Sequence, residues 1–417
     1  MPGERRHFRA VQRSPGPRAA TTALVLLTAV NLLNYIDRYV VPAVFESLKR
    51  SDFRPSDAQL GLLMSGFLLV YTLTAPIFGR IGDTGRRPRA LAAGVALWSA
   101  ATALGGVAWS YVSLLVARAV VGVGEAAYGT IGPSLLADHF PPRNRGRALA
   151  VFFMAIPVGA ALGFMIGGFV DHHWGWRRAF FVAGIPGLLL AALVARLPDP
   201  VRGGSDAAAP PPASGTFAAL QTNRAYLLTV LGYAAYTFAL GGIATWMAPF
   251  LERVRGLAGN VATVRFGGIV VLTGFAGTAL GGWLGDVLAQ RTRNGYLWLS
   301  GIATLFAAPL FYLALASATP AVYWAAMIGA ELLMFTSTGP VNTVIVSVVP
   351  PGIRASAMAL SILTIHLLGD VPSPALVGWL SDRTSLDLAV RILPVAALVG
   401  GIVWTYAAAT TRATPAV

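Results

Sequence analysis

Long apolar segments separated by short polar loops dominate the hydrophobic pattern along the chain. A helix that crosses a bilayer needs about 20 predominantly apolar residues, and loops rich in arginine, glycine and proline divide the chain into segments of that length. We therefore predict twelve membrane-spanning helices, over residues 20–47, 58–79, 88–109, 111–137, 146–170, 178–197, 225–250, 265–288, 295–317, 320–348, 354–380 and 388–409.

Two local motifs add detail to these helices. Ser56 is followed three residues later by Gln59, which is the spacing of a capping box and predicts a helix start at that point. Gly159, Gly163 and Gly167 recur every fourth residue in the fifth segment. They share one helical face, and such a face predicts tight packing against another helix.

Composition supports an integral membrane protein and excludes several other classes. Hydrophobic residues make up 56% of the 417 residues and charged residues 12%, whereas soluble domains are about one quarter charged. The net charge of +14 is not a nucleic-acid signal, because the basic residues lie in short loops. Cysteine is absent, which excludes disulfides and thiolate metal sites. We expect no metal, no cofactor and no nucleic-acid partner.

The distribution of basic residues predicts the orientation. The N-terminal tail and every second loop carry roughly twice as many Arg and Lys residues as the alternate loops. Under the positive-inside rule both termini are then cytoplasmic. We expect a multi-pass protein of a bacterial inner (plasma) membrane.

A central linker predicts two halves. The stretch PDPVRGGSDAAAPPPASG follows Leu197 and can bury little surface. We expect the chain to comprise a cytoplasmic N-terminal tail, a six-helix bundle, a cytoplasmic linker, a second six-helix bundle and a C-terminal tail, over residues 1–19, 20–197, 198–224, 225–409 and 410–417. GRIGDTGRR in the first half and GGWLGDVLAQR in the second echo each other, as expected for a duplicated unit.

The segment GRIGDTGRR (79–87) between the second and third helices resembles the G-x-L-A-D-x-x-G-R-R signature of the major facilitator superfamily. The resemblance implies the major facilitator fold, an all-α polytopic membrane protein of twelve helices in two six-helix halves. It also implies that Asp83, Arg86 and Arg87 hold the cytoplasmic side closed. The alternative is that these arginines only orient the chain.

Ionisable residues occur in the middle of four predicted helices. Each ionised group there costs about 2.5 to 3.5 kcal/mol on insertion scales, so such groups are usually functional. Neighbours in sequence point about 100° apart on a helix, so Asp37 and Arg38 each need a partner on another helix. The alternative is a purely structural ion-pair network. The residues are Asp37, Arg38, Arg118, Glu125, Glu331, His366 and Asp370.

Residues around these groups narrow the resemblance. The segments NYIDR (34–38), GEAAYGTIGPSLLADHF (124–140) and HLLGDVPSP (366–374) are together similar to the spinster family of lysolipid and sphingolipid transporters. The resemblance implies proton-coupled transport of lysophospholipids or sphingosine-phosphate-like single-chain lipids by alternating access. A drug/proton antiporter or an organic-anion/proton symporter of the same fold is the alternative.

Chemistry assigns candidate roles within this family. Arginine forks match phosphate oxygens, so Arg38 and Arg118 are expected to bind a headgroup, and carboxylates or a histidine can carry protons. The candidate substrate-binding residues are Arg38, Arg118, Glu125, Tyr35 and Glu331, and the candidate proton-coupling residues are Asp37, Glu125, His366 and Asp370. No metalloprotease, nucleophile-elbow or nucleotide-loop motif is present, so we expect a monomeric transporter, in contact with membrane lipids, and not an enzyme.

Overall fold

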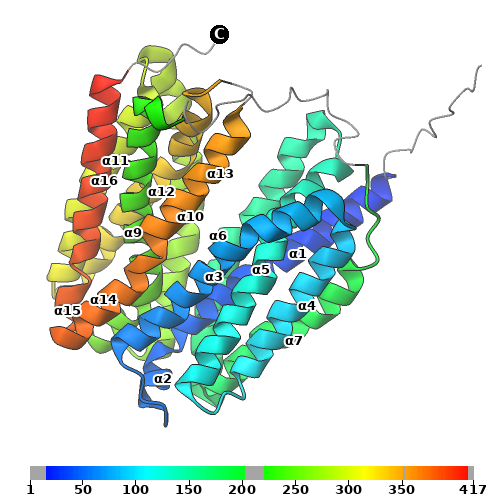
Figure 1. Ribbon diagram of the computed structural model, residues 1–417. Coiled ribbons are helices and arrows are strands. Elements are labelled where there is room, and N and C mark those ends of the chain that lie inside the picture. Colours follow the sequence, from blue (N-terminus) through cyan, green and yellow to red (C-terminus); the bar gives the residue numbers. More distant parts are fainter. Residues whose placement is uncertain (1–15, 202–219, 351–352, 412–417) are drawn as a thin grey trace, which may run out of the picture.

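The computed structural model describes residues 16–201, 220–350 and 353–411, and within these ranges the regular structure is helical throughout (Figure 1). The predicted all-α class is therefore confirmed. Parts of the predicted tails and linker, residues 1–15, 202–219 and 412–417, lie outside the described residues. The helices are α1 (Pro17–Ala43), α2 (Phe45–Arg50), α3 (Asp57–Thr84), α4 (Arg87–Gly105), α5 (Tyr111–His139), α6 (Pro142–Trp174), α7 (Trp176–Val194), α9 (Arg224–Arg253), α10 (Gly259–Arg291), α11 (Gly295–Ala316), α12 (Pro320–Ser347), α13 (Arg354–Ile365), the π-helix η2 (His366–Asp370), α14 (Pro372–Arg383), α15 (Leu386–Ala389) and α16 (Ile392–Thr410).

Eleven helical segments of the described residues are long and apolar enough to cross a membrane. The remaining predicted span is α4, which begins with Arg87 and Arg89 and therefore has fewer apolar residues, and which packs against α5 and α7. The predicted eleventh span is one helical path, made of α13, η2 and α14 in succession.

The helices pack in two groups. The first consists of α1 to α7 and the second of α9 to α16, and the principal contacts between them join α3 to α14 and α6 to α10 (Figure 1). Below, the termini face is the side at which α1 begins and α16 ends, and the loop face is the opposite side, which carries α2 and α15. The two groups lie closest together at the loop face and diverge toward the termini face (Figure 1).

The start of α3 fastens the two groups at the loop face. The predicted capping box is confirmed, because Gln59 N donates to Ser56 Oγ and Ser56 N donates to the Gln59 side chain. The next two backbone amides, of Asp57 and Ala58, donate to the Asp382 carboxylate of α14 at 2.8 Å each. A carboxylate at a helix N-terminus is favourable, and here it comes from the other group.

The glycine face of α6 positions the helix that carries Asp37 and Arg38. A Cβ added at Gly159 or Gly163 would lie 2.7 Å from a backbone oxygen of α1, and one at Gly167 would lie 2.8 Å from Ala43 Cβ. Such distances leave no room for a side chain. The predicted packing role of these glycines is confirmed, and their partner is α1.

Candidate functional site

Four ionisable side chains form two ion pairs between α1 and α5. Arg38 Nε donates to Glu125 Oε2 at 2.6 Å, and Arg118 Nη1 donates to Asp37 Oδ1 at 3.1 Å. Asp37, Arg118 and Glu125 are each at most 1% exposed. Asp37 and Arg38 point in different directions because they are sequence neighbours, so they reach two residues of α5 that lie two turns apart. The prediction that both need partners on another helix is confirmed.

Both oxygens of Asp37 are occupied, whereas its neighbours keep unused polar atoms. Thr102 Oγ1 of α4 donates to Asp37 Oδ2 at 2.6 Å. Nε and Nη2 of Arg118 and Oε1 of Glu125 are buried without a hydrogen-bond partner. Each such atom costs roughly 1 to 3 kcal/mol. Arg118 and Glu125 therefore have hydrogen-bonding capacity that a rearrangement or a ligand could use.

One aromatic ring lies close to both guanidinium groups. The ring centroid of Phe67 in α3 lies 5.2 Å from Arg38 Cζ and 4.8 Å from Arg118 Cζ. The rings of Tyr35 and Tyr71 lie 5.1 and 5.0 Å from Arg38 Cζ. Aromatic rings at such distances attract a cation, so they replace part of the hydration that Arg38 has lost. Sequence reasoning identified Tyr35 but missed Phe67 and Tyr71, which carry no local signal.

The glycines between Arg118 and Glu125 bring α5 against two neighbouring helices. A Cβ at Gly122 would lie 2.5 Å from the Phe67 carbonyl oxygen in α3, and one at Gly124 would lie 2.6 Å from the Gly94 carbonyl oxygen in α4. The space beside these glycines is therefore filled by neighbouring backbones.

A cavity of about 100 Å³, called the central cavity below, lies between the two helix groups. Tyr35, Arg38 and Tyr39 line it from α1, and Asp370 lines it from η2. The Arg38 side chain is 18% exposed, whereas that of Arg118 is 1% exposed and lies outside the lining. Arg38 is therefore the cation that a ligand in this cavity could reach directly.

His366 and Asp370 form a hydrogen-bonded pair on η2. His366 Nδ1 lies 2.9 and 3.0 Å from the two carboxylate oxygens of Asp370. The turn is widened, because Val371 N donates to the His366 carbonyl five residues earlier and Pro372 follows without an amide hydrogen. The His366 ring also lies 6.2 Å from that of Tyr71 in the first helix group. The pair therefore adjoins both groups.

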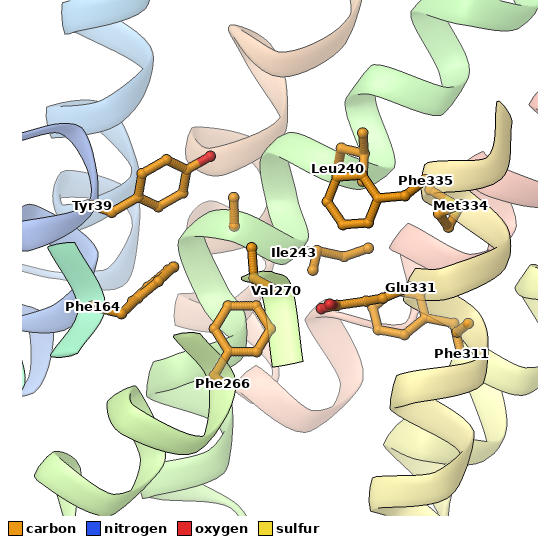
Figure 2. Close-up of a pocket in the computed structure, with 12 residues that line it drawn as sticks. Tyr39, Phe164, Leu240, Ile243, Phe266, Val270, Phe311, Glu331, Met334 and Phe335 are labelled. Carbon is orange, nitrogen blue, oxygen red and sulfur yellow. The ribbon is translucent and has the colours of Figure 1, made fainter. Parts of the chain in front are cut away.

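Glu331 of α12 lies apart from these side chains, in a second cavity of about 120 Å³ that we call the aromatic cavity (Figure 2). Thr273 Oγ1 of α10 lies 3.0 Å from its Oε2. Tyr39 and Ala244 line both cavities. Arg38 and Glu331 therefore approach adjoining spaces from opposite helix groups.

Comparison with known proteins gives the family. The sequence profile of the Major Facilitator Superfamily matches residues 27–374. Protein spinster homolog 3 of Danio rerio is 34% identical over 421 aligned positions, which cover 92% of this chain and 84% of that protein. The chain belongs to the spinster family of this superfamily. Protein spinster homolog 1 of Homo sapiens is 35% identical over 402 positions, covering 89% of this chain and 74% of its own length.

The fold of spinster-family proteins is also recovered in three dimensions. The crystal structure of a bacterial homolog of the human lysosomal transporter Spinster, in an inward-facing and unoccupied conformation, superposes with a TM-score of 0.87. The two chains are 24% identical, and the match covers 96% of this chain and 100% of that one. The predicted major facilitator fold is confirmed, and the spinster-family chain is an integral, multi-pass membrane protein of a transporter family.

In this spinster-family chain, the predicted gate residues lie at the termini face. Arg87 is 2% exposed and binds inside the first helix group: it donates to Asp138, to Asp199 at 2.8 Å and to the Pro200 carbonyl at 2.6 Å. Asp83 and Arg86 are exposed, and no ion pair between them and the second group is found in the described part of the chain. Their role as a gate stays a prediction.

The spinster-family chain has a denser ion-pair cluster at the loop face, which sequence reasoning missed. Asp57 accepts from Arg253 Nη1 at 2.6 Å, from Ser381 Oγ at 2.6 Å and from Lys49 Nζ. Arg253 also donates to Glu46 of α2. The cluster connects α2 and α3 with α9 and α14, so it closes the loop face. Arg253 and Ser381 lie 196 and 324 positions from Asp57 in the sequence, and the members show no common motif.

Proposed function

We propose that this spinster-family chain is a proton-coupled secondary transporter that moves lysophospholipids or sphingosine-phosphate-like single-chain lipids by alternating access. The Arg38–Glu125 pair beside the central cavity carries the proposal. An arginine fork binds a phosphate as well as a carboxylate. A substrate phosphate entering this cavity would therefore compete with Glu125 for Arg38.

This competition provides a physical route to coupling. Removing one partner of a buried ion pair costs about 3 to 5 kcal/mol, because the other charge is left unpaired. A proton on Glu125 would leave Arg38 without its carboxylate, and a phosphate would then supply the missing negative charge. Proton binding and phosphate binding therefore favour each other. A proton on Asp37 would free Arg118 in the same way, once Arg118 becomes accessible.

His366 and Asp370 are suited to pass a proton toward the central cavity. Asp370 lines the cavity that Arg38 lines, and His366 holds its carboxylate. Histidine changes charge near neutral pH. We propose that this pair exchanges protons between the termini face and the carboxylates of α1 and α5.

The apolar surroundings support a lipid substrate. A cavity of about 530 Å³ between α3, α5 and α13 is lined mainly by apolar side chains and includes His366 and Tyr71. His366 connects it with the central cavity through its bond to Asp370. An acyl chain would lie in this apolar space while its phosphate binds Arg38.

The orientation of the protein in the membrane follows from where its basic loops lie. The basic loops after α3, α5 and α10 lie on the termini face, so we propose that this face is cytoplasmic and that the protein works in a bacterial inner membrane. The fastened loop face then corresponds to an inward-facing state.

We propose that Asp83 and Arg86 pair with the second group only when the termini face closes. Since one chain contains both groups and the cavity between them, we propose a monomeric transporter.

Flux through reconstituted liposomes tests the proposal. Purified protein would be offered a lysophospholipid, a sphingoid phosphate and a small organic anion, with and without a pH gradient. We expect lipid flux that depends on the gradient, loss of this dependence in Glu125→Gln, and normal flux in Glu252→Gln, a matched change at the loop face. Gradient-driven flux of the small anion with no flux of either lipid would contradict the lipid assignment.

A further inference from the structure

Asn34, the first residue of the NYIDR segment, is a buried polar side chain with an unused donor. It is 2% exposed, and its Nδ2 has no hydrogen-bond partner. Asn31, about one turn earlier on α1, is buried to the same extent, but its Nδ2 donates to the Phe152 carbonyl at 2.8 Å. A buried donor that stays unpaired is strongly unfavourable. The Asn34 amide therefore gains nothing in this state of the protein, which points to a partner in another state.

Contacts between α1 and α5 bracket the level at which Asn34 lies. The ion pair of α5 with Asp37 lies toward the loop face, and Tyr128 Oη of α5 donates to the Leu27 carbonyl at 3.0 Å toward the termini face. Asn34 on α1 and Glu125 on α5 each lie between these two contacts. Both residues therefore belong to the same stretch of the interface between the two helices.

Arg38 brings the side chains of Asn34 and Glu125 together. Asn34 precedes Arg38 by four residues, so the two side chains share one face of α1. Side chains on a helix lean toward its N-terminus, so the Arg38 side chain extends over the turn that carries Asn34. Glu125 Oε2 lies 2.6 Å from Arg38 Nε. The Glu125 carboxyl group is therefore held beside the Asn34 amide.

The unused atoms of these two neighbours are complementary. Glu125 Oε1 is an acceptor that is buried without a partner, and Asn34 Nδ2 is a donor in the same condition. Arg118 also has unused donors, but its side chain leans along α5 toward the loop face, away from Glu125. A rearrangement of two side chains would join Asn34 to Glu125.

A proton makes this rearrangement favourable. An ionised carboxylate gains more from the guanidinium of Arg38 than from a neutral amide. A protonated carboxyl group has an O–H donor and a carbonyl acceptor, and a primary amide has an acceptor and two donors. The two groups can therefore form a neutral pair with two hydrogen bonds, which suits a buried site. We propose that Asn34 is the partner of protonated Glu125 and thereby sets the affinity of this carboxyl group for its proton.

This inference rests on the proposed function, in which a substrate phosphate takes Arg38 while Glu125 takes a proton. Asn34 would stabilise the carboxyl group that Arg38 has left, so it is a positioning residue for coupling. The other charged or titratable side chains around the pair are Tyr35, Asp37, Arg38, Tyr71 and Arg118. Variants of Asn34 leave all of them in place, so a change in proton affinity would come from the amide.

Infrared difference spectroscopy of the purified protein measures the state of Glu125 without any lipid. A protonated carboxyl group gives a C=O band, and the band that disappears in Glu125→Gln belongs to this residue. We expect Asn34→Leu to move the band to higher frequency, because its carbonyl loses a hydrogen bond. The pH at which the band appears should fall by about one unit, since the protonated form loses its partner. Asn34→Gln keeps the amide and should restore most of this shift.

Asn31→Leu is the matched control on the same helix. It removes a buried amide that is bonded to Phe152, so we expect a lower melting temperature with an unchanged Glu125 band and an unchanged midpoint. Asn34→Leu removes an amide whose donor is unused in this state, so the melting temperature should not fall. If Asn34→Leu does not fold, the smaller Asn34→Ala gives the same spectroscopic answer.

The outcomes separate this inference from the proposed function. An unchanged band and midpoint in Asn34→Leu, or an equal shift in Asn31→Leu, would overturn the role of Asn34. A titration in which no band disappears in Glu125→Gln would overturn it as well, because Glu125 would then hold no proton. Flux that ignores the pH gradient, found together with the expected band shift, would contradict only the proposed coupling, since the spectroscopy needs no substrate.

Discussion

The ion-pair cluster at the loop face should set the balance between the two transport states. Arg253 contributes hydrogen bonds to Asp57 at 2.6 and 3.2 Å and one to Glu46, and its side chain is 25% exposed. Replacing it with Gln removes the charge that joins α9 to α2 and α3. Asp57 keeps Lys49 and Ser381 as partners, so the first helix group should stay folded.

The size of the effect follows from the number and burial of the bonds. A hydrogen bond to a charged group contributes about 1.5 to 3 kcal/mol, and partial exposure and the remaining donors reduce the sum. We expect a net loss of about 2 kcal/mol for the loop-face-closed state, which is a shift of about 30-fold. A second state populated at about 1% would then rise to about one quarter.

Arg50 provides a matched control across the same face. It approaches Glu252 at 3.3 Å, and its side chain is 65% exposed. Exposed pairs of this kind contribute about 0 to 1 kcal/mol, so Arg50→Gln should change the population only slightly.

Spin labels can measure the populations, because the chain contains no cysteine. Asp52 and Thr384 are exposed at the loop face, one in each helix group. Cysteines placed there would report the distance between the groups by double electron–electron resonance. We expect a new, longer distance in Arg253→Gln and not in Arg50→Gln. If both variants gave the same distance distribution, whether changed or unchanged, the ion-pair cluster would not be what holds the loop face closed.

Three further variants test other parts of the molecule. Asp37→Asn leaves buried Arg118 without its carboxylate, so we expect lipid flux to lose its dependence on the pH gradient while exchange without a gradient persists; unaltered dependence would exclude a coupling role for Asp37. Gly61→Val would place a Cβ 2.2 Å from the Pro374 carbonyl oxygen, so it should stop transport by preventing closure of the loop face. The spin-label distance should then be longer while expression of the protein stays normal. Arg87→Gln removes the cation shared by two carboxylates and should lower the free energy of unfolding by about 3 to 5 kcal/mol. Denaturation in mixed micelles would measure this change, and a loss below about 1 kcal/mol would show that the network contributes little.

Several features of the site were predictable because they depend on local geometry alone. The capping box at Ser56 and the glycine face of α6 follow from residues a few positions apart. The conclusion that Asp37 and Arg38 cannot pair with each other follows from the helical rotation between neighbours. Sequence reasoning also identified Arg118 and Glu125 as ionisable residues inside a helix, and the structure pairs both with the two residues of α1.

Partner choice was not predictable, because it depends on which helices become neighbours. Sequence alone could not tell that Arg38 would pair with Glu125 while Arg118 pairs with Asp37, or that Phe67 would lie close to both arginines. Arg87 was expected at a gate between the halves, and the described structure places it among the carboxylates of its own group. Contacts of this kind carry no periodic signal.

The sequence by itself determined that this chain is helical, that it lies in a membrane and which family it belongs to. Those properties follow from apolar segment length, the cost of charges in lipid and contiguous motifs. Tertiary structure alone decided which charges meet, which are sealed from the cavities and which stay unpartnered. Glu331 illustrates the difference, because its helix gives no sign that aromatic rings from four other helices would line the same cavity or that one of its carboxyl oxygens would lack a partner. Pair distances of a few ångströms are fixed by how helices distant in sequence pack together, and local pattern does not encode that packing.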